Sequence, residues 1–73
     1  MRQMRPGERR AFERAISLFG SQNRLALACG IPQQQINAIA RGVRELDPYE
    51  AVAIERATQG SITRRMLISD LWD

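Results

Sequence analysis

Apolar residues recur at three- and four-residue intervals along most of this 73-residue chain. Such spacing places them on one face of a helix, whereas a half-buried strand needs strict alternation, which no segment of useful length shows. The first stripe consists of Phe12, Ala15, Ile16 and Phe19. It predicts a helix from Glu8 to Phe19 that Gly20 ends.

Two shorter helices are predicted next, over residues 22–29 and 33–41. Ser21 is a suitable N-cap for the first, because its hydroxyl accepts a hydrogen bond from a free amide of the opening turn. Gly30 ends that helix in the left-handed conformation, which glycine adopts without strain. Gly42 is the corresponding stop for the second.

Capping signals frame a fourth helix, from Pro48 to about Thr58. Asp47 is the expected N-cap, Pro48 fits the first helical position, and Glu50 completes a reciprocal capping pair. Its inward residues are Ala51, Ile54 and Ala57.

Thr63 caps a fifth helix, with Ile62 and Leu67 at the positions of a hydrophobic staple. The pattern therefore predicts an all-α protein of about five helices. Pro6-Gly7 is a turn signal that separates a short arm from the first helix. We expect one domain over residues 8–73, preceded by a flexible basic arm over residues 1–7.

The two central helices fit a helix-turn-helix, in which the second helix lies in the DNA major groove. Three residues separate them, and Ala26 is small where a larger side chain would hold the second helix away. Ile36 and Ile39 fall on one face of the second helix and point back at the first.

The opposite face of that second helix is polar and predicts contacts with DNA bases. At 100° per residue it collects Gln33, Gln34, Asn37, Ala38 and Arg41, with Gln35 on the flank. Amide side chains bond adenine through two hydrogen bonds, arginine does so to guanine, and an alanine can meet a thymine methyl group. The alternative is a merely solvated face, but such faces are usually rich in Glu and Lys, and this one has neither.

The start of the first motif helix offers contacts with DNA phosphates, because the free amides of a helix N-terminus bind anions. Ser21 and Gln22 lie there, followed by Asn23 and Arg24, which are phosphate candidates or simply solvated. Arg44 lies just past the second helix. A phosphate contact and a solvated loop position are equally expected for it.

The motif resembles the helix-turn-helix of Cro-type phage repressors in Gln22, Ala26, Gly30, Gln33, Ile36 and Asn37. The segment from Ala51 to Trp72 is similar to the end of the small Cro/YdaS-like regulators. This resemblance implies a five-helix DNA-binding domain of the lambda-repressor/Cro type, of phage or bacterial origin. It also implies that Gln22 touches the DNA backbone and supports the recognition helix.

The chain departs from that family at Pro32, where a Ser or Thr N-cap is usual. Proline has no side-chain acceptor, although it is favoured at the first helical position. We therefore expect Ile31 to take the cap site, or the recognition helix to begin slightly differently.

Charge is segregated along the sequence. Residues 1–44 hold eight arginines and two glutamates, whereas residues 45–73 hold three arginines and six acids. The basic half contains the helix-turn-helix, as a phosphate-facing surface requires. Nucleotide composition could explain why arginine is the only basic residue, but it does not explain the segregation.

The composition gives no support for an enzyme, a cofactor site or a metal site. There is no histidine, Cys29 is the only cysteine, and no glycine-rich phosphate loop is present. Asp47 and Glu50 are accounted for by capping. The longest apolar run, Leu25–Cys29, is too short for a membrane span or a signal core, so we expect a cytoplasmic, nucleoid-associated protein.

The leading hypothesis is a sequence-specific regulator of double-stranded DNA, a Cro-type repressor that binds its operator as a homodimer. Candidate dimer contacts are Val43–Leu46, Tyr49 and Leu71–Trp72, although Trp72 could instead pack on the first helix. Arg2 and Arg5 could form a basic arm in the minor groove or a disordered terminus.

An alternative hypothesis is an antitoxin-like protein-interaction module that neutralises a partner protein, with DNA binding secondary. Binding of structured RNA ranks lower, because the chain lacks an aromatic stacking platform.

Overall fold

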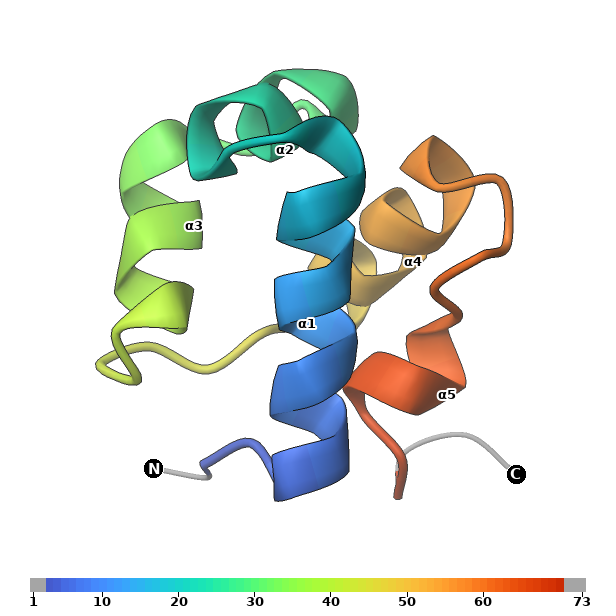
Figure 1. The fold of residues 1–73 in the computed structure, drawn as a ribbon. Helices are drawn as coiled ribbons and strands as arrows, with labels where there is room; N and C mark the ends of the chain where they lie inside the picture. The colour runs from blue at the N-terminus through green and yellow to red at the C-terminus, as the bar shows by residue number, and fades with distance from the viewer. Residues whose placement is uncertain (1–2, 71–73) are drawn as a thin grey trace.

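The computed structural model describes residues 3–70, in which five helices and no strand are found (Figure 1). The helices are α1 (Pro6–Phe19), α2 (Gln22–Cys29), α3 (Gln33–Ala40), α4 (Pro48–Ala57) and α5 (Arg64–Leu67). Helix α1 runs through the middle of the molecule, with α3 on one side and α5 on the other. The predicted all-α class with five helices is confirmed. None of the described helices is long and apolar enough to span a membrane.

Helix α1 begins two residues earlier than predicted. Pro6 and Gly7 form its first turn, and Arg5 is its N-cap, whose backbone N–H donates to the Glu8 carboxylate at 2.9 Å. The expected break at Pro6-Gly7 is wrong because the fixed φ of proline suits the first helical position, where its missing N–H costs nothing. Gly20 ends the helix at φ 94°, as predicted.

The caps predicted for the next helices are present. The Ser21 hydroxyl accepts from the Arg24 N–H at 3.1 Å at the start of α2. At the start of α4, Asp47 accepts from the Glu50 N–H at 2.8 Å, while the Glu50 carboxylate accepts from the Asp47 N–H at 3.0 Å. Thr63 caps α5, which is only four residues long.

All described helices contribute to one apolar core. Its fully buried large apolar side chains are Phe12, Leu25, Ile36, Ile39, Ile54, Ile62 and Leu67. Ile62 and Leu67, at the predicted staple positions, are both 0% exposed. The predicted inward residues Ile16, Phe19 and Ala57 are only half-buried, because they lie near the ends of their helices, where the core thins.

A buried carboxylate joins the two ends of the described chain. Glu8 is 2% exposed and accepts hydrogen bonds from the Ser69 backbone N–H at 2.7 Å and the Ser69 hydroxyl at 2.6 Å. Beside it, the Arg5 guanidinium lies 3.4 Å from the Asp70 carboxylate. These contacts fix the segment after α5 against the start of α1. They unite residues more than 60 positions apart, so helical periodicity gave no sign of them.

Candidate nucleic-acid interface

Helices α2 and α3 are joined by the predicted three-residue turn. Gly30 has φ 69° and donates its N–H to Leu27 O at 3.4 Å, while the Ile31 N–H reaches Ala26 O at 3.1 Å. This pair of bonds is a Schellman motif, which requires the left-handed residue that glycine supplies. Ala26 is 4% exposed beneath α3, and the helices pack closely over it. The local structure therefore has the form of a helix-turn-helix.

Pro32 is itself the N-cap of α3, with φ −56° and ψ 138°. Its carbonyl accepts from the N–H groups of Gln35 at 3.0 Å and Ile36 at 3.3 Å. The expectation that Ile31 takes the cap site is wrong, since its side chain is buried in the core at 9% exposure. No side chain caps α3, so its opening turn has no side-chain acceptor for its amides.

The outer face of α3 carries the residues predicted to contact bases. Beneath it, Ile36 is 0% and Ile39 1% exposed, and these two side chains anchor the helix on the core. On the outer side Gln33, Gln34 and Arg41 are exposed. Asn37 and Ala38, in the middle of the helix, are half-buried. Gln35, assigned to the flank, is half-buried too.

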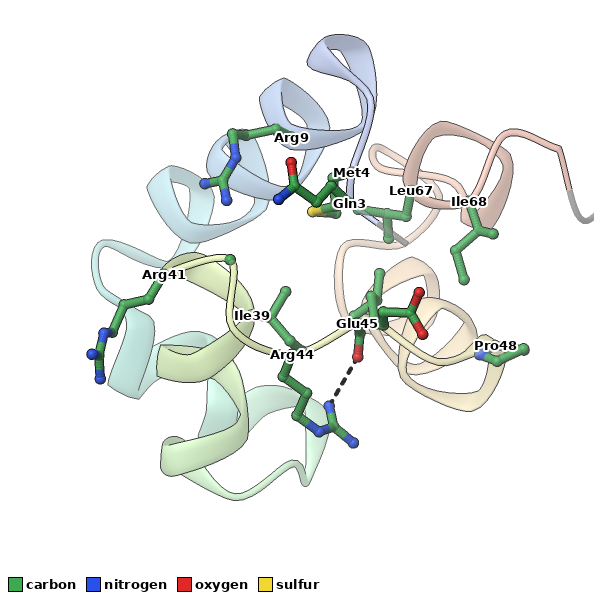
Figure 2. Close-up of a pocket in the computed structure, with 12 residues that line it drawn as sticks. Gln3, Met4, Arg9, Ile39, Arg41, Arg44, Glu45, Pro48, Leu67 and Ile68 are labelled. Carbon is green, nitrogen blue, oxygen red and sulfur yellow. Dashed lines mark hydrogen bonds between the residues drawn. The ribbon is translucent and has the colours of Figure 1, made fainter. Parts of the chain in front are cut away.

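The helix ends one residue before its predicted limit. Ala40 is its last residue and Arg41 its C-cap, after which the N–H of Gly42 reaches Ile39 O at 3.1 Å and that of Val43 reaches Ala38 O at 3.0 Å. Gly42 has φ 79° and is the stop that the sequence predicts. Arg41 therefore projects from the end of α3, where Figure 2 shows its guanidinium directed away from the adjoining pocket.

The phosphate candidates before α3 gather at the start of α2. Ser21 and Gln22 are half-buried, whereas Asn23 and Arg24 are exposed. The Ser21 hydroxyl oxygen already accepts the capping bond of α2. Its O–H group can still donate a hydrogen bond to a phosphate.

Arg44 is held by carboxylates of the same protein. Its Nη1 lies 2.8 Å from both carboxylate oxygens of Glu50, which is 6% exposed, and its Nη2 lies 3.8 Å from Asp47. A further bond joins Nη1 to the Glu45 carbonyl at 3.3 Å (Figure 2). The hydrogen bond that Arg44 donates to the Glu50 carboxylate raises the pKa of Arg44, although burial acts in the opposite direction. Arg44 thus fixes the α3–α4 loop on the start of α4.

Arg9 lies outside the apolar stripe of α1 and makes a contact that the sequence did not predict. Its Nη1 donates to the Ala40 carbonyl at 3.0 Å, so α1 holds the C-terminal end of α3 directly. The same guanidinium lies 3.9 Å from Glu13. Periodicity could not reveal the contact with Ala40, since the two residues are 31 positions apart.

A pocket of about 350 Å³ adjoins the end of α3 (Figure 2). Its apolar wall is formed by Met4, Ile39, Leu46, Leu67 and Ile68, and Arg9, Arg41 and Arg44 line it as well. In residues 3–70 no group of three or more His, Cys, Asp or Glu residues lies close enough to hold a metal ion.

Cys29 is a half-buried residue of α2. It packs against the core, and burial raises the pKa of its thiol to about 11.

The residues predicted for the basic arm and for the dimer contact differ in their exposure, and some lie outside the described part of the chain. Arg5 caps α1 and pairs with Asp70, whereas Arg2, Leu71 and Trp72 lie outside the described residues. Val43 is 57% and Tyr49 87% exposed, so both side chains are accessible for a dimer contact. Leu46 is buried in the core at 8% exposure and is not available for a dimer contact.

Comparison with known proteins places this geometry in a family. The family described as "Bacterial toxin YdaS" matches residues 12–73. The chain belongs to the YdaS family. It is 33% identical over 64 residues to the Escherichia coli K12 protein named "Putative transcriptional regulator YdaS". That match covers 88% of this chain but only 65% of the relative, so the chain spans about two thirds of the length of that YdaS protein.

A solved structure agrees in fold. The Cro protein from a prophage element, Xfaso 1, of Xylella fastidiosa strain Ann-1 matches with a TM-score of 0.72 at 34% identity, over 86% of this chain and 95% of the other. The Cro-like and YdaS-like resemblance predicted from the sequence is thereby confirmed. Of these two proteins similar to the YdaS-family chain, one is named a putative transcriptional regulator and the other a Cro protein.

Proposed function

We propose that this YdaS-family protein is a sequence-specific regulator of double-stranded DNA that inserts α3 into the major groove of an operator. The observation that carries the proposal is the two-sided character of α3. Ile36 and Ile39 are fully buried on its inner side, while the amides of Gln33 and Gln34 are exposed on its outer side. An amide side chain offers a donor and an acceptor in one plane, which suits the edge of adenine.

Base contacts and phosphate contacts have separate roles in this proposal. The base-contacting residues are Gln33, Gln34, Asn37, Ala38 and Arg41. Ser21, Gln22, Asn23 and Arg24 bind phosphates at the start of α2, where the helix dipole favours an anion. Arg44 remains a phosphate candidate, because a guanidinium has five N–H donors and its bonds to Glu50 leave some of them for a phosphate.

The regulator acts as a dimer on DNA in this proposal, because one recognition helix contacts too few base pairs for useful selectivity. Two-fold related copies would bind half-sites about 34 Å apart. Exposed Tyr49 and Val43 are the candidate dimer contacts among the described residues. Occupation of an operator in the cytoplasm would repress transcription by excluding other proteins.

Selection of bound sites from random oligonucleotides tests the proposal. We expect a recurring sequence with two-fold symmetry, bound by the purified chain at least a thousandfold more tightly than unrelated duplexes. Recovery of no common sequence, with all duplexes bound alike at moderate ionic strength, would contradict it.

A second candidate comes from the description of the family, which names a toxin. Under this reading the chain is a protein-interaction module, and DNA binding is secondary. Gel shifts with the DNA upstream of the protein's own gene, beside capture of partners from a lysate, separate the two functions.

A further inference from the structure

A second surface feature lies between α1 and α5. It is a groove of about 530 Å³, called the α1–α5 groove below. Its apolar floor includes Ala11, Ile62 and Met66, with Gly7 at one end. Four arginines line it as well, Arg5, Arg10, Arg14 and Arg65. Its volume lies in the range of sites that hold ligands or inserted side chains.

This groove is separate from the proposed DNA-binding face. Arg9 on α1 faces α3, as its bond to Ala40 O shows, whereas Ala11 lies about 200° further around the same helix. Figure 1 shows α3 and α5 on opposite sides of α1. A duplex seated on α3 therefore does not cover the α1–α5 groove.

Part of the positive charge of the groove is not compensated by the described residues. Among residues 3–70, Glu8 is the only acid that lines the groove, and this carboxylate is buried and hydrogen-bonded to Ser69. Arg5 pairs with Asp70, and Arg65 has a partner as well. In residues 3–70, no ion pair is formed by Arg10 or Arg14, which lie one turn apart on α1.

No carboxylate among residues 3–70 is left to compensate Arg10 and Arg14. Every acidic side chain there already has a partner: Glu8, Glu13, Glu45, Asp47, Glu50, Glu55 and Asp70. Within residues 3–70, a second copy of the chain would therefore have to break existing contacts of its carboxylates to supply the groove. DNA phosphates match the arginines but gain nothing from an apolar floor.

We infer that the α1–α5 groove binds an acidic amphipathic segment of a partner protein. Apolar side chains of that segment rest on Met66, which is 44% exposed beside the buried Ala11 and Ile62, and its carboxylates pair with Arg10 and Arg14. Arginine forms two parallel hydrogen bonds with a carboxylate and is enriched at the centre of protein interfaces. A helix laid in a groove is a common form of such recognition. A regulator bound to DNA through α3 would still present this surface.

The test is a titration of the isotope-labelled full chain with a synthetic helical peptide about three turns long, with leucines on one face and glutamates beside them. Amide chemical shifts report where the peptide binds. We expect changes at Gly7, Ala11, Met66 and Ser69 and none over residues 33–41. A peptide with glutamine in place of glutamate, and a polyglutamate of the same length, should each bind at least tenfold more weakly.

Two variants of the groove decide the outcome. Arg10→Gln with Arg14→Gln should weaken peptide binding about tenfold or more, while Arg56→Gln, which removes an exposed arginine from α4, should change it less than twofold. Gly7→Leu should block the groove without harming the fold, since a Cβ at Gly7 meets no atom within 4 Å. Thermal melting confirms that each variant is folded.

Several results would overturn the inference. Equal binding of the glutamine peptide, shifts centred on α3, or no loss in the double variant would each do so. A random DNA duplex that produces the same shifts at lower concentration would show that the groove is a phosphate-binding surface. Shifts that depend on protein concentration in the absence of peptide would show that a second copy fills it. Site selection on DNA is measured separately, so failure here leaves the proposed regulator intact.

Discussion

At the scale of single residues, the outer side chains of α3 differ in what they can contribute. Gln33 and Gln34 are exposed at the start of the helix, whereas Asn37 is half-buried further along. Exposed amides reach a base edge without displacing protein neighbours. The sequence predicted these residues because helical geometry fixes which positions share a face, and that geometry is local.

Gln34→Ala should cost about 1–3 kcal/mol of binding free energy at a single base pair of the operator, because it removes two hydrogen bonds to one base. Affinity for unrelated DNA should be unchanged, since phosphate contacts remain. Titrations of wild type and variant against operators altered at one position each provide the measurement. Equal losses on operator and unrelated DNA would remove Gln34 from base contact.

Arg44→Met should lower the free energy of unfolding by about 1–3 kcal/mol, because it leaves the carboxylate of Glu50 buried without its cation. Urea unfolding measures this change. The matched control is Arg56→Met on the exposed side of α4, which should change stability by no more than about 0.5 kcal/mol. A double variant, Arg44→Met with Glu50→Met, should recover part of the loss, and an additive loss would contradict a direct pair.

Cys29 should remain a neutral thiol to high pH. Burial raises its pKa to about 11 from an ordinary value of 9.0, so the unfolded chain loses this proton at lower pH than the folded one. The stability that the neutral thiol contributes is present below pH 9.0 and is lost as pH rises towards 11. Alkylation by iodoacetamide in the native protein should accelerate with a midpoint near 11, and a midpoint near 9.0 would contradict the burial.

At the scale of elements, the sequence predicted where helices begin and end better than how they are fastened together. Ser21, Asp47 and Thr63 cap their helices as expected, because a capping bond spans only three residues. The start of α1 was missed because the first-turn preference of proline outweighed the turn signal of Pro6-Gly7. The contacts between helices join distant segments, such as Arg9 with Ala40, and no local sequence pattern predicts them.

Arg9→Met should separate positioning of α3 from contact with DNA. Loss of the bond to the Ala40 carbonyl should weaken operator binding and lower the free energy of unfolding by about 1–3 kcal/mol. The slope of log affinity against log salt concentration should stay the same, because a residue that only positions α3 releases no counterion. A phosphate contact would instead reduce the magnitude of that slope by about 0.9.

At the scale of the whole molecule, the two surfaces proposed here for DNA and for a partner protein lie on different sides of α1. The basic half of the chain supplies α1, α2 and α3, while most carboxylates lie in the second half, where Asp47 and Glu50 pair with Arg44 and Glu55 pairs with Arg64. The segregation was visible in the sequence. The α1–α5 groove was not, since it depends on where α5 packs against α1.

Binding of DNA should fall steeply with salt, because arginine–phosphate contacts release counterions. A dimer that makes about six phosphate contacts should lose about a thousandfold in affinity between about 50 and 200 mM salt. Fluorescence anisotropy with a labelled operator measures the slope. A shallow slope, equivalent to one or two contacts, would argue against the proposed cluster at Ser21, Gln22, Asn23 and Arg24.

The most direct test of the central claim is a competition titration in which a labelled operator is displaced by unlabelled operator or by an unrelated duplex. Wild type and a triple variant, Gln33→Ala with Gln34→Ala and Asn37→Ala, are compared at moderate ionic strength. We predict that the wild type prefers the operator at least a thousandfold, and that the folded triple variant binds both duplexes with similar, weak affinity. A triple variant that keeps the full preference for the operator would show that the outer face of α3 does not recognise the bases.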